Sequence, residues 1–205
     1  MENKHIIINV GRQLGSGGHD IARMLAHDFN AKYYDKEILN LAAKESGFSE
    51  KIFEQNDEKK GFIRGLFSMT TPHVSGVYES GFSQENLFKF QSDAIRKAAE
   101  KGSCVFVGRC ADYVLRDFEN VVNIFITASM HDRVQQILNK QSVTPPEAKH
   151  MILQAESKRA AYYNYYTGKK WGHAESYDLC VNSSILGLDE TEKMIADFIR
   201  KRFEL

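Results

Sequence analysis

Short apolar runs alternate with longer stretches of helical spacing along this chain. The apolar runs cover residues 6–10, 31–34, 104–107, 121–127 and 177–181. Between them, apolar residues recur every three or four positions, as in an amphipathic helix, over residues 36–44, 84–101, 130–140, 146–166 and 189–203. Because the short runs are mostly apolar and do not alternate strictly between apolar and polar residues, we expect parallel strands that are buried on both faces. The order of the elements therefore predicts an α/β fold in which helices flank a doubly wound parallel sheet.

Residues 56–81 interrupt this alternation. They mix glycines and a proline with bulky apolar side chains, a composition that predicts a flexible excursion. A chain of 205 residues can bury one core. We therefore expect a single domain, residues 1–205, that carries this excursion as a mobile helical insertion.

Composition narrows the class of protein. The 27 basic and 27 acidic side chains balance, so the overall charge favours neither nucleic acid nor an anionic membrane as a partner. No stretch approaches the roughly 20 apolar residues of a membrane-spanning helix. The three cysteines and seven histidines show no metal-binding or disulfide spacing. We therefore expect a cytoplasmic protein with reduced thiols and no bound structural metal.

The most informative segment surrounds the first apolar run. Residues 6–26 have the pattern of a strand, a glycine-rich turn and a helix. The turn and the start of the helix are formed by Gly15, Ser16, Gly17, Gly18, His19 and Asp20. Glycines let the backbone approach a ligand closely, and the free N–H groups of a helix N-terminus favour an anion. We therefore predict a phosphate-binding cradle; a tight connection without a ligand is the alternative.

Polar residues also follow the next two apolar runs. Asp35 and Lys36 come after the second run, and Gly108, Arg109 and Asp112 come after the third. The carboxyl ends of parallel strands meet at one edge of a sheet, where ligands bind. Arg109 is suited to hold a phosphate through two hydrogen bonds, with Gly108 leaving room for it. The alternatives are a helix cap at Asp35 and a surface arginine at position 109.

These motifs, in this order, resemble the nucleoside monophosphate kinases, and most closely a variant branch of the cytidylate kinase-like family. The resemblance rests on Gly-Ser-Gly-x-x-x-Ile-Ala at the first turn, Tyr-Asp after the second run, Gly-Arg after the third, and Ile-Phe-Ile-Thr-Ala-Ser-x-x-x-Arg around the fourth. It implies a three-layer fold of the P-loop NTPase type. It also implies an acceptor-side helical region at about residues 36–100 and a lid at about residues 141–175.

The same resemblance implies a phosphotransferase that moves a phosphoryl group from ATP to a small acceptor, most simply CMP or dCMP. Mg²⁺ would bridge the donor oxygens. The residues from Gly15 to Asp20 would bind the phosphates of ATP. The acceptor would be bound or bordered by Asp35, Gly108, Arg109 and Asp112. Nucleotides, rather than nucleic acid or membrane, would be the partners, and a homodimer is left open.

Two residues of the turn depart from the family pattern. Gly18 stands where the P-loop lysine is expected, and Asp20 stands where a threonine would bind Mg²⁺. Another cation must then supply the missing charge. Arg12, Lys36 and Arg159 are candidates, and we assign Lys36 and Arg159 as the catalytic pair.

Two further questions stay open at this point. Arg159 lies among other basic residues, so the alternative to a catalytic role is a place on a solvated helix face. The tyrosines at 162, 163, 165 and 166 predict packing within the protein, and base stacking is the alternative. The second hypothesis for the whole chain is a kinase-like binding module that retains the phosphate site without turnover.

Overall fold

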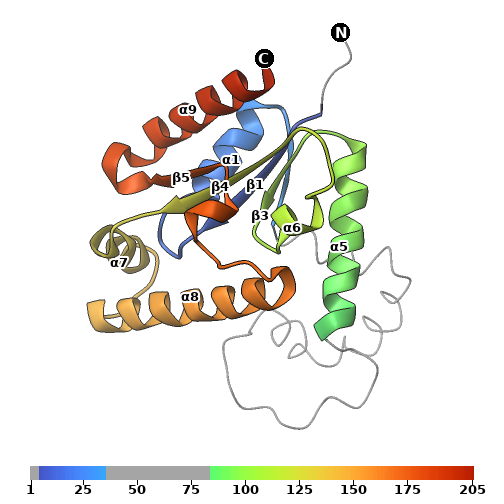
Figure 1. The fold of residues 1–205 in the computed structure, drawn as a ribbon. Helices are drawn as coiled ribbons and strands as arrows, with labels where there is room; N and C mark the ends of the chain where they lie inside the picture. The colour runs from blue at the N-terminus through green and yellow to red at the C-terminus, as the bar shows by residue number, and fades with distance from the viewer. Residues whose placement is uncertain (1–4, 36–83) are drawn as a thin grey trace, which may run out of the picture. The chain divides into compact units, whose positions relative to one another are not determined.

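A five-stranded parallel sheet forms the centre of the computed structural model, which describes residues 5–35 and 84–205 (Figure 1). The strand order is β2-β3-β1-β4-β5. The central strand β1 (Ile7–Arg12) lies between β3 (Cys104–Val107) and β4 (Val121–Thr127). The edge strands are β2 (Lys32–Tyr34) and β5 (Leu179–Asn182). All strands run in one direction, so their carboxyl ends share one edge of the sheet.

Helices α1 (Gly18–Asp28) and α9 (Ser183–Phe203) pack together on one face of the sheet. Their apolar sides bury alternate strand residues, among them Ile8, Val10 and Ile124, each at most 1% exposed. This burial supplies the main core, because each removed Å² of apolar surface contributes roughly 25 cal/mol. This core fixes the orientation of β1 and therefore the position of the glycine-rich turn that follows it.

Helices α7 (Met130–Leu138) and α8 (Pro145–Thr167) form a second, smaller core. They pack through Ile137, Ala148 and Ile152. Helix α8 begins with Thr144 in a capping box and prolines in its first turn, which sets its start sharply. The two helices follow β4, so their side chains can reach the carboxyl edge of the sheet.

The chain divides into two compact units, residues 1–35 with 98–205, and residues 36–97. Helix α5 (Gln84–Lys101) begins in the second unit and ends in the first. The first unit contains the whole sheet and helix α1. It also contains α6 (Ala111–Val114), α7, α8, η1 (Ala174–Ser176) and α9. Among the described helices, none is both long and apolar enough to cross a bilayer.

The predicted strands at residues 104–107 and 121–127 and the helix at 84–101 are confirmed. The predicted ends of the first and last strands were wrong. Strand β1 continues through Gly11 and Arg12, which pair with Phe125 and Ile126, because these residues keep extended backbone beside β4. Strand β5 begins later than predicted. The predictions for residues 36–44 and 56–81 lie outside the described residues.

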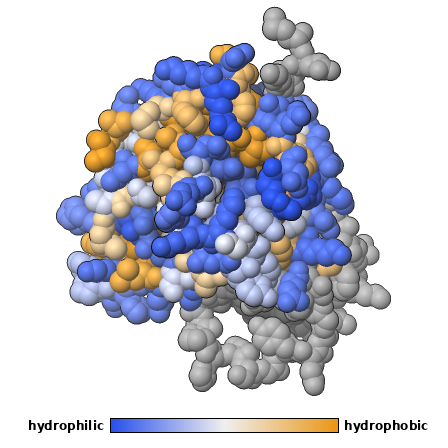
Figure 2. All heavy atoms as spheres, viewed as in Figure 1, coloured by the Kyte–Doolittle hydropathy of each residue, from blue (hydrophilic) through white to orange (hydrophobic). Residues whose placement is uncertain are grey.

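Helix α9 begins at Ser183 rather than at residue 189, because Asn182 caps the first turn through its side chain. Gly187 then breaks the helical backbone (φ 76°, ψ 177°), so a kink separates the first turn from the remainder. Beside the kink, Ile185 and Leu186 are 75% and 48% exposed, and Figure 2 shows apolar surface over this part of α9. The kink thus turns apolar side chains outward near the carboxyl edge of the sheet.

Candidate functional site

The glycine-rich turn connects β1 to α1 and needs glycine at two positions. Gly15 and Gly17 have φ values of 82° and 72°, in the left-handed region that side chains disfavour. A Cβ at Gly15 would lie 2.6 Å from the Arg133 carbonyl oxygen, and one at Gly17 would lie 2.2 Å from Leu188 Cδ2. Among the described residues, the N–H groups of Gly18 and His19 have no backbone partner, whereas the Asp20 N–H donates to the Gly17 carbonyl at 2.9 Å. The turn therefore has the geometry of an anion cradle.

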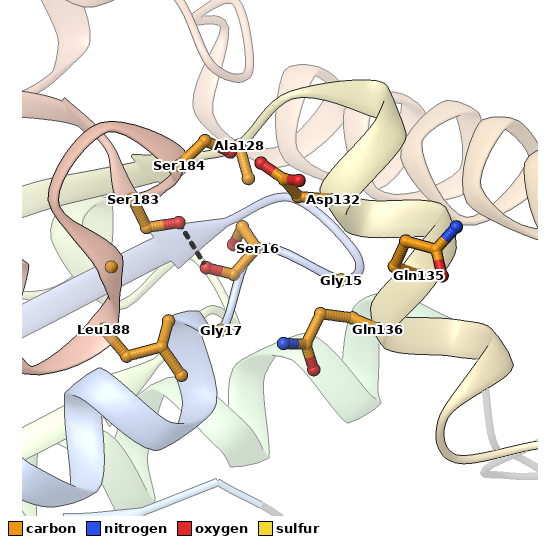
Figure 3. A pocket seen from close by; sticks show the side chains of 11 residues that line it. Gly15, Ser16, Gly17, Ala128, Asp132, Gln135, Gln136, Ser183, Ser184 and Leu188 are labelled. Atoms are coloured by element: carbon orange, nitrogen blue, oxygen red, sulfur yellow. Dashed lines mark hydrogen bonds between the residues drawn. The ribbon is translucent and has the colours of Figure 1, made fainter.

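Ser16 holds this turn in place from within. Its hydroxyl donates to the Gln13 carbonyl at 3.0 Å, and its own carbonyl accepts from Ser183 Oγ at 2.8 Å (Figure 3). Ser16 is 1% exposed. The start of α9 is thereby tied to the turn, and the Ser16 side chain is engaged within the protein.

A pocket of about 330 Å³ opens beside the turn, between α7 and α9 (Figure 3). The Gln136 side chain extends from α7 toward Gly17 and Leu188. The pocket is lined by Gly15, Ser16, Gly17, Ala128, Asp132, Gln135, Gln136, Ser183, Ser184, Gly187 and Leu188. Amide, hydroxyl and carboxylate groups at its wall can hydrogen-bond a polar ligand whose charged end lies on the turn.

Three arginines converge on the carboxyl edge of the sheet. Arg12 ends β1, Arg109 follows β3, and Arg159 comes from α8 and donates from Nη1 to the Arg12 carbonyl at 2.9 Å. Burial, together with the charges of Arg159 and Arg109, lowers the pKa of Arg12 to about 10. Burial likewise lowers the pKa of Arg159. The three side chains together produce a concentrated positive potential at this edge.

The backbone around Arg109 is unusual. Gly108, Arg109 and Cys110 have consecutive positive φ values of 74°, 61° and 55°. Two of the three are not glycine, and such strain is retained where surrounding structure enforces it, often at functional sites. Arg109 makes no hydrogen bond or ion pair with any residue that the structure describes. Its guanidinium is available for a ligand.

His19 links the cradle to the end of β2. Its Nε2 accepts a hydrogen bond from Arg12 Nη2 at 3.1 Å, which leaves the ring proton on Nδ1 in the neutral form. Nδ1 lies 3.0 Å from the Tyr33 hydroxyl and 3.3 Å from the Asp35 carboxylate. The structure therefore brings Asp35 and His19 together, and through His19 it connects both to Arg12.

We expect His19 to be neutral at pH 7 and to couple stability to pH. Burial and the Arg12 charge lower the pKa of His19 to about 4. The unfolded chain, with an ordinary histidine pKa near 6.5, takes up this proton first as the pH falls. The stabilising contribution is thus present above about pH 6.5 and is lost as the pH falls toward about 4. Unfolding by urea across this range should show a smaller loss in His19→Gln than in the unmodified protein, and an NMR titration of the ring with a pKa at or above 6.5 would contradict the expectation.

Two predicted site residues already have partners within the protein. Asp112 is 8% exposed and accepts a hydrogen bond from the Tyr163 hydroxyl at 2.6 Å, while burial raises the pKa of its carboxyl. The Asp20 carboxylate lies 3.7 Å from Lys140 Nζ. Neither contact brings these carboxylates to the arginines. Lys36 lies outside the described residues, so its role stays a prediction.

The tyrosines of α8 divide between packing and exposure. Tyr163 is 5% exposed and stacks on Tyr177, whereas Tyr165 is 70% exposed. Tyr162 and Tyr166 pack against each other, with ring centroids 4.7 Å apart. Packing is therefore confirmed for Tyr163, and no base-stacking platform is needed to explain it.

Arg133 received no role from the sequence, although it belongs to the motif after the fourth apolar run. Its Nε donates to the Leu14 carbonyl at 2.9 Å, and its guanidinium forms a buried ion pair with Glu156. Its backbone also packs against Gly15. Arg133 thus joins the glycine-rich turn to α7 and α8. The sequence signal that could have indicated this role is the position of Arg133 in the first turn of a helix that directly follows a strand.

Described residues contain no group of three or more histidine, cysteine, aspartate or glutamate side chains that could hold a metal ion. Asp20, at the start of α1, is the carboxylate nearest in sequence to the cradle. A Mg²⁺ ion that arrives with a nucleotide keeps several water ligands and needs few protein ligands. Asp20 is thus a carboxylate among the described residues that could reach, through water, a Mg²⁺ ion carried by a nucleotide.

The fold is that of the P-loop kinases. A shikimate kinase from Bacteroides thetaiotaomicron superposes with a TM-score of 0.53 at 13% identity, over 98% of this chain and 100% of that one. A gluconokinase from Sinorhizobium meliloti gives a TM-score of 0.56 at 10% identity, over 97% and 94%. At these identities the likeness concerns the fold alone.

The sequence defines the family more narrowly. The model of the cytidylate kinase-like family matches residues 7–185, and the chain belongs to that family. A cytidylate kinase from Staphylothermus marinus is 24% identical over 96% of this chain and 97% of its own length. An uncharacterized protein from Eubacterium ventriosum is 30% identical, with a TM-score of 0.74, over 97% of this chain and 99% of that one.

Proposed function

We propose that this protein transfers the γ-phosphoryl group of ATP to a nucleoside monophosphate, with CMP or dCMP as the first acceptors to test. The observation that carries the proposal is the convergence of Arg12, Arg109 and Arg159 beside a glycine-rich turn. Phosphoryl transfer requires mainly positive charge and in-line positioning. Membership in the cytidylate kinase-like family supports a nucleotide acceptor.

The donor is proposed to lie along the turn and in the pocket beside it. Backbone N–H groups from Gly15 to His19 would bind its phosphates, and the helix dipole of α1 would add favourable charge. The pocket of about 330 Å³ would take the nucleoside part, where Gln135, Gln136 and Asp132 offer hydrogen bonds. Mg²⁺ bound to the donor would neutralise phosphate charge, with Asp20 reaching it through water.

The acceptor phosphate is proposed to bind at Arg109, with Gly108 and Asp35 at its border. Arg109 has no protein partner among the described residues, so its donors are free for a phosphate. The sequence also predicted Asp112 as an acceptor-binding residue. Its hydrogen bond with Tyr163 favours a structural role instead, in which Asp112 stabilises the turn between β3 and α6. Arg159 would add positive charge around the transferring group, and the role of Lys36, which lies outside the described residues, stays a prediction.

The test is a coupled assay of phosphotransfer with ATP and Mg²⁺ over a panel of nucleoside monophosphates. We expect turnover with at least one pyrimidine monophosphate. A protein that binds ATP by calorimetry but shows no turnover with any acceptor would be a binding module, the second candidate function, which the absence of lysine at Gly18 favours.

Arg109→Ala should weaken acceptor binding by at least about tenfold and leave ATP binding nearly intact. A hydrogen bond to a charged group contributes roughly 1.5–3 kcal/mol, and 1.4 kcal/mol corresponds to a factor of ten. Arg109→Lys should recover only part of the loss, because the two-pronged contact is missing. Calorimetric titrations with CMP and with ATP measure the two affinities separately. An equal loss for donor and acceptor would identify Arg109 as a structural residue instead.

A further inference from the structure

We propose that Arg12 supplies the charge that a P-loop lysine would supply at the donor phosphates, from the last residue of β1 rather than from α1. The inference rests on the proposed function and names the cation that its chemistry requires. Its basis is one juxtaposition: the Arg12 side chain runs along Gly18, where the lysine would stand, and ends over Gly108.

Crowding at Gly18 shows why a lysine is absent there. A Cβ at this position would lie 2.5 Å from Arg12 Cβ and 3.0 Å from Arg12 Cγ. Both atoms belong to the base of the side chain, which cannot move aside cheaply. Gly18 lies inside α1 with a helical backbone, so its φ does not require glycine. Arg12 and a side chain at position 18 therefore exclude each other.

The far end of Arg12 reaches the acceptor side of the site. Its Nη1 lies 2.5 Å from the position that a Cβ would take at Gly108, directly before Arg109. The side chain thus extends from the start of α1 to the β3–α6 turn. A guanidinium in this place lies between the proposed donor cradle and the proposed acceptor arginine.

Arg12 is also a partly buried cation with an unused donor. Its Nε is buried without a hydrogen-bond partner, and His19 Nε2 accepts the hydrogen bond from Nη2. Arg12 forms no ion pair with any described carboxylate. Asp35 adds a favourable negative charge near Arg12, on the far side of His19, but no described carboxylate contacts the guanidinium directly, and a bound phosphate would supply that direct partner. His19 is a positioning residue in this arrangement, because it holds the guanidinium in place.

The transfer step then balances without any proton moving to or from Arg12. An oxygen of the acceptor monophosphate forms a bond to the γ-phosphorus as the bond to the β,γ-bridging oxygen breaks. The bridging oxygen keeps the electron pair and leaves as part of ADP. Arg12 stays protonated and donates hydrogen bonds to the oxygens on which charge develops.

A stability cycle tests the geometry without any substrate. Gly18→Ala should lower the free energy of unfolding in the unmodified protein, because its methyl group meets Arg12. In an Arg12→Gly background, the same change should be neutral or stabilising, since alanine favours a helix over glycine. Equal effects of Gly18→Ala in both backgrounds would overturn the assigned packing.

Ligand binding and turnover test the chemistry. Arg12→Met should weaken ATP binding about tenfold and leave the affinity for AMP unchanged, because AMP lacks the β- and γ-phosphates. The same variant should lower kcat about 100-fold. Arg12→Gly combined with Gly18→Lys should recover at least tenfold of the kcat lost in Arg12→Gly. The matched control is Arg116→Met, an exposed arginine on the Tyr113 ring.

The outcomes separate this inference from the proposed function. An active protein whose Arg12→Met variant retains full kcat and ATP affinity overturns the role of Arg12 alone. Absence of turnover with every monophosphate overturns the proposed function. In that case, a loss of affinity for ATP but not for AMP in Arg12→Met still supports the contact between Arg12 and the donor phosphates. Unchanged ATP affinity rejects that contact.

Discussion

Replacing Arg159 with methionine is expected to lower kcat about 100-fold while KM for both substrates changes only a few-fold. Removing one group that acts on developing charge typically costs this much in kcat, and an interaction made mainly in the transition state affects turnover more than binding. Arg159 is suited to that role because its guanidinium is partly buried, lies against the end of β1, and adds positive charge beside Arg12 and Arg109.

Two companion variants make this expectation specific. Arg159→Lys keeps the charge but loses the planar guanidinium whose Nη1 donates to the Arg12 carbonyl, so an intermediate kcat is expected. Lys149→Met removes an exposed cation from the same helix and should leave kcat unchanged. Steady-state kinetics with varied donor and acceptor separate kcat from KM. Full turnover in Arg159→Met would leave Arg159 with only its structural hydrogen bond to the Arg12 carbonyl.

Gly17→Val is expected to reduce ATP affinity about 100-fold. The substitution removes backbone access to the phosphates, and the loss of two hydrogen bonds to a charged group, at roughly 1.5–3 kcal/mol each, accounts for such a factor. Valine is also strained at a φ of 72°, and its Cβ would meet Leu188, which lines the pocket. Calorimetry with ATP measures the loss, and circular dichroism checks that the fold is retained.

The control for Gly17→Val is Gly102→Val. Gly102 also has a positive φ, of 157°, but no atom lies within 4 Å of its Cβ position. This variant should cost stability through backbone strain and leave ATP affinity unchanged. Unchanged ATP affinity in Gly17→Val itself would show that the turn is a tight connection and not a phosphate cradle.

Local pattern was enough to predict much of the sheet. The runs at residues 104–107 and 121–127 are predominantly apolar, so their extent could be predicted. The predicted burial holds throughout β3 and only in part for β4, where Val121, Asn123 and Thr127 are half-buried. The end of β1 could not, because Gly11 and Arg12 look like part of a glycine-rich turn. Only pairing with β4 keeps them extended, and pairing between distant segments is not encoded in local spacing.

The candidate site was predictable in its position and less so in its contacts. The rule that parallel strands gather ligands at their carboxyl ends placed Gly17, His19, Asp35 and Arg109 at one edge of the sheet. The sequence named Arg12 among three candidate cations, and Lys36 and Arg159 were assigned as the catalytic pair. The closeness of Arg12 to Gly18, on which our proposal for Arg12 rests, follows from the course of a strand beside a helix and is not visible in local pattern. The partner of Asp112 was equally hidden, since Tyr163 is distant along the chain.

The crowding between positions 12 and 18 also limits how such a protein can change over generations. Lysine at position 18 and arginine at position 12 cannot share the same volume, so an ancestor with one could not gain the other by a single exchange without steric conflict. Losing the first cation before gaining the second would pass through a chain with neither. Under the role that we propose for Arg12, either order crosses a poor intermediate, which would keep lineages with each arrangement apart. Searches for relatives should therefore treat the two positions as a pair, and not score position 18 alone.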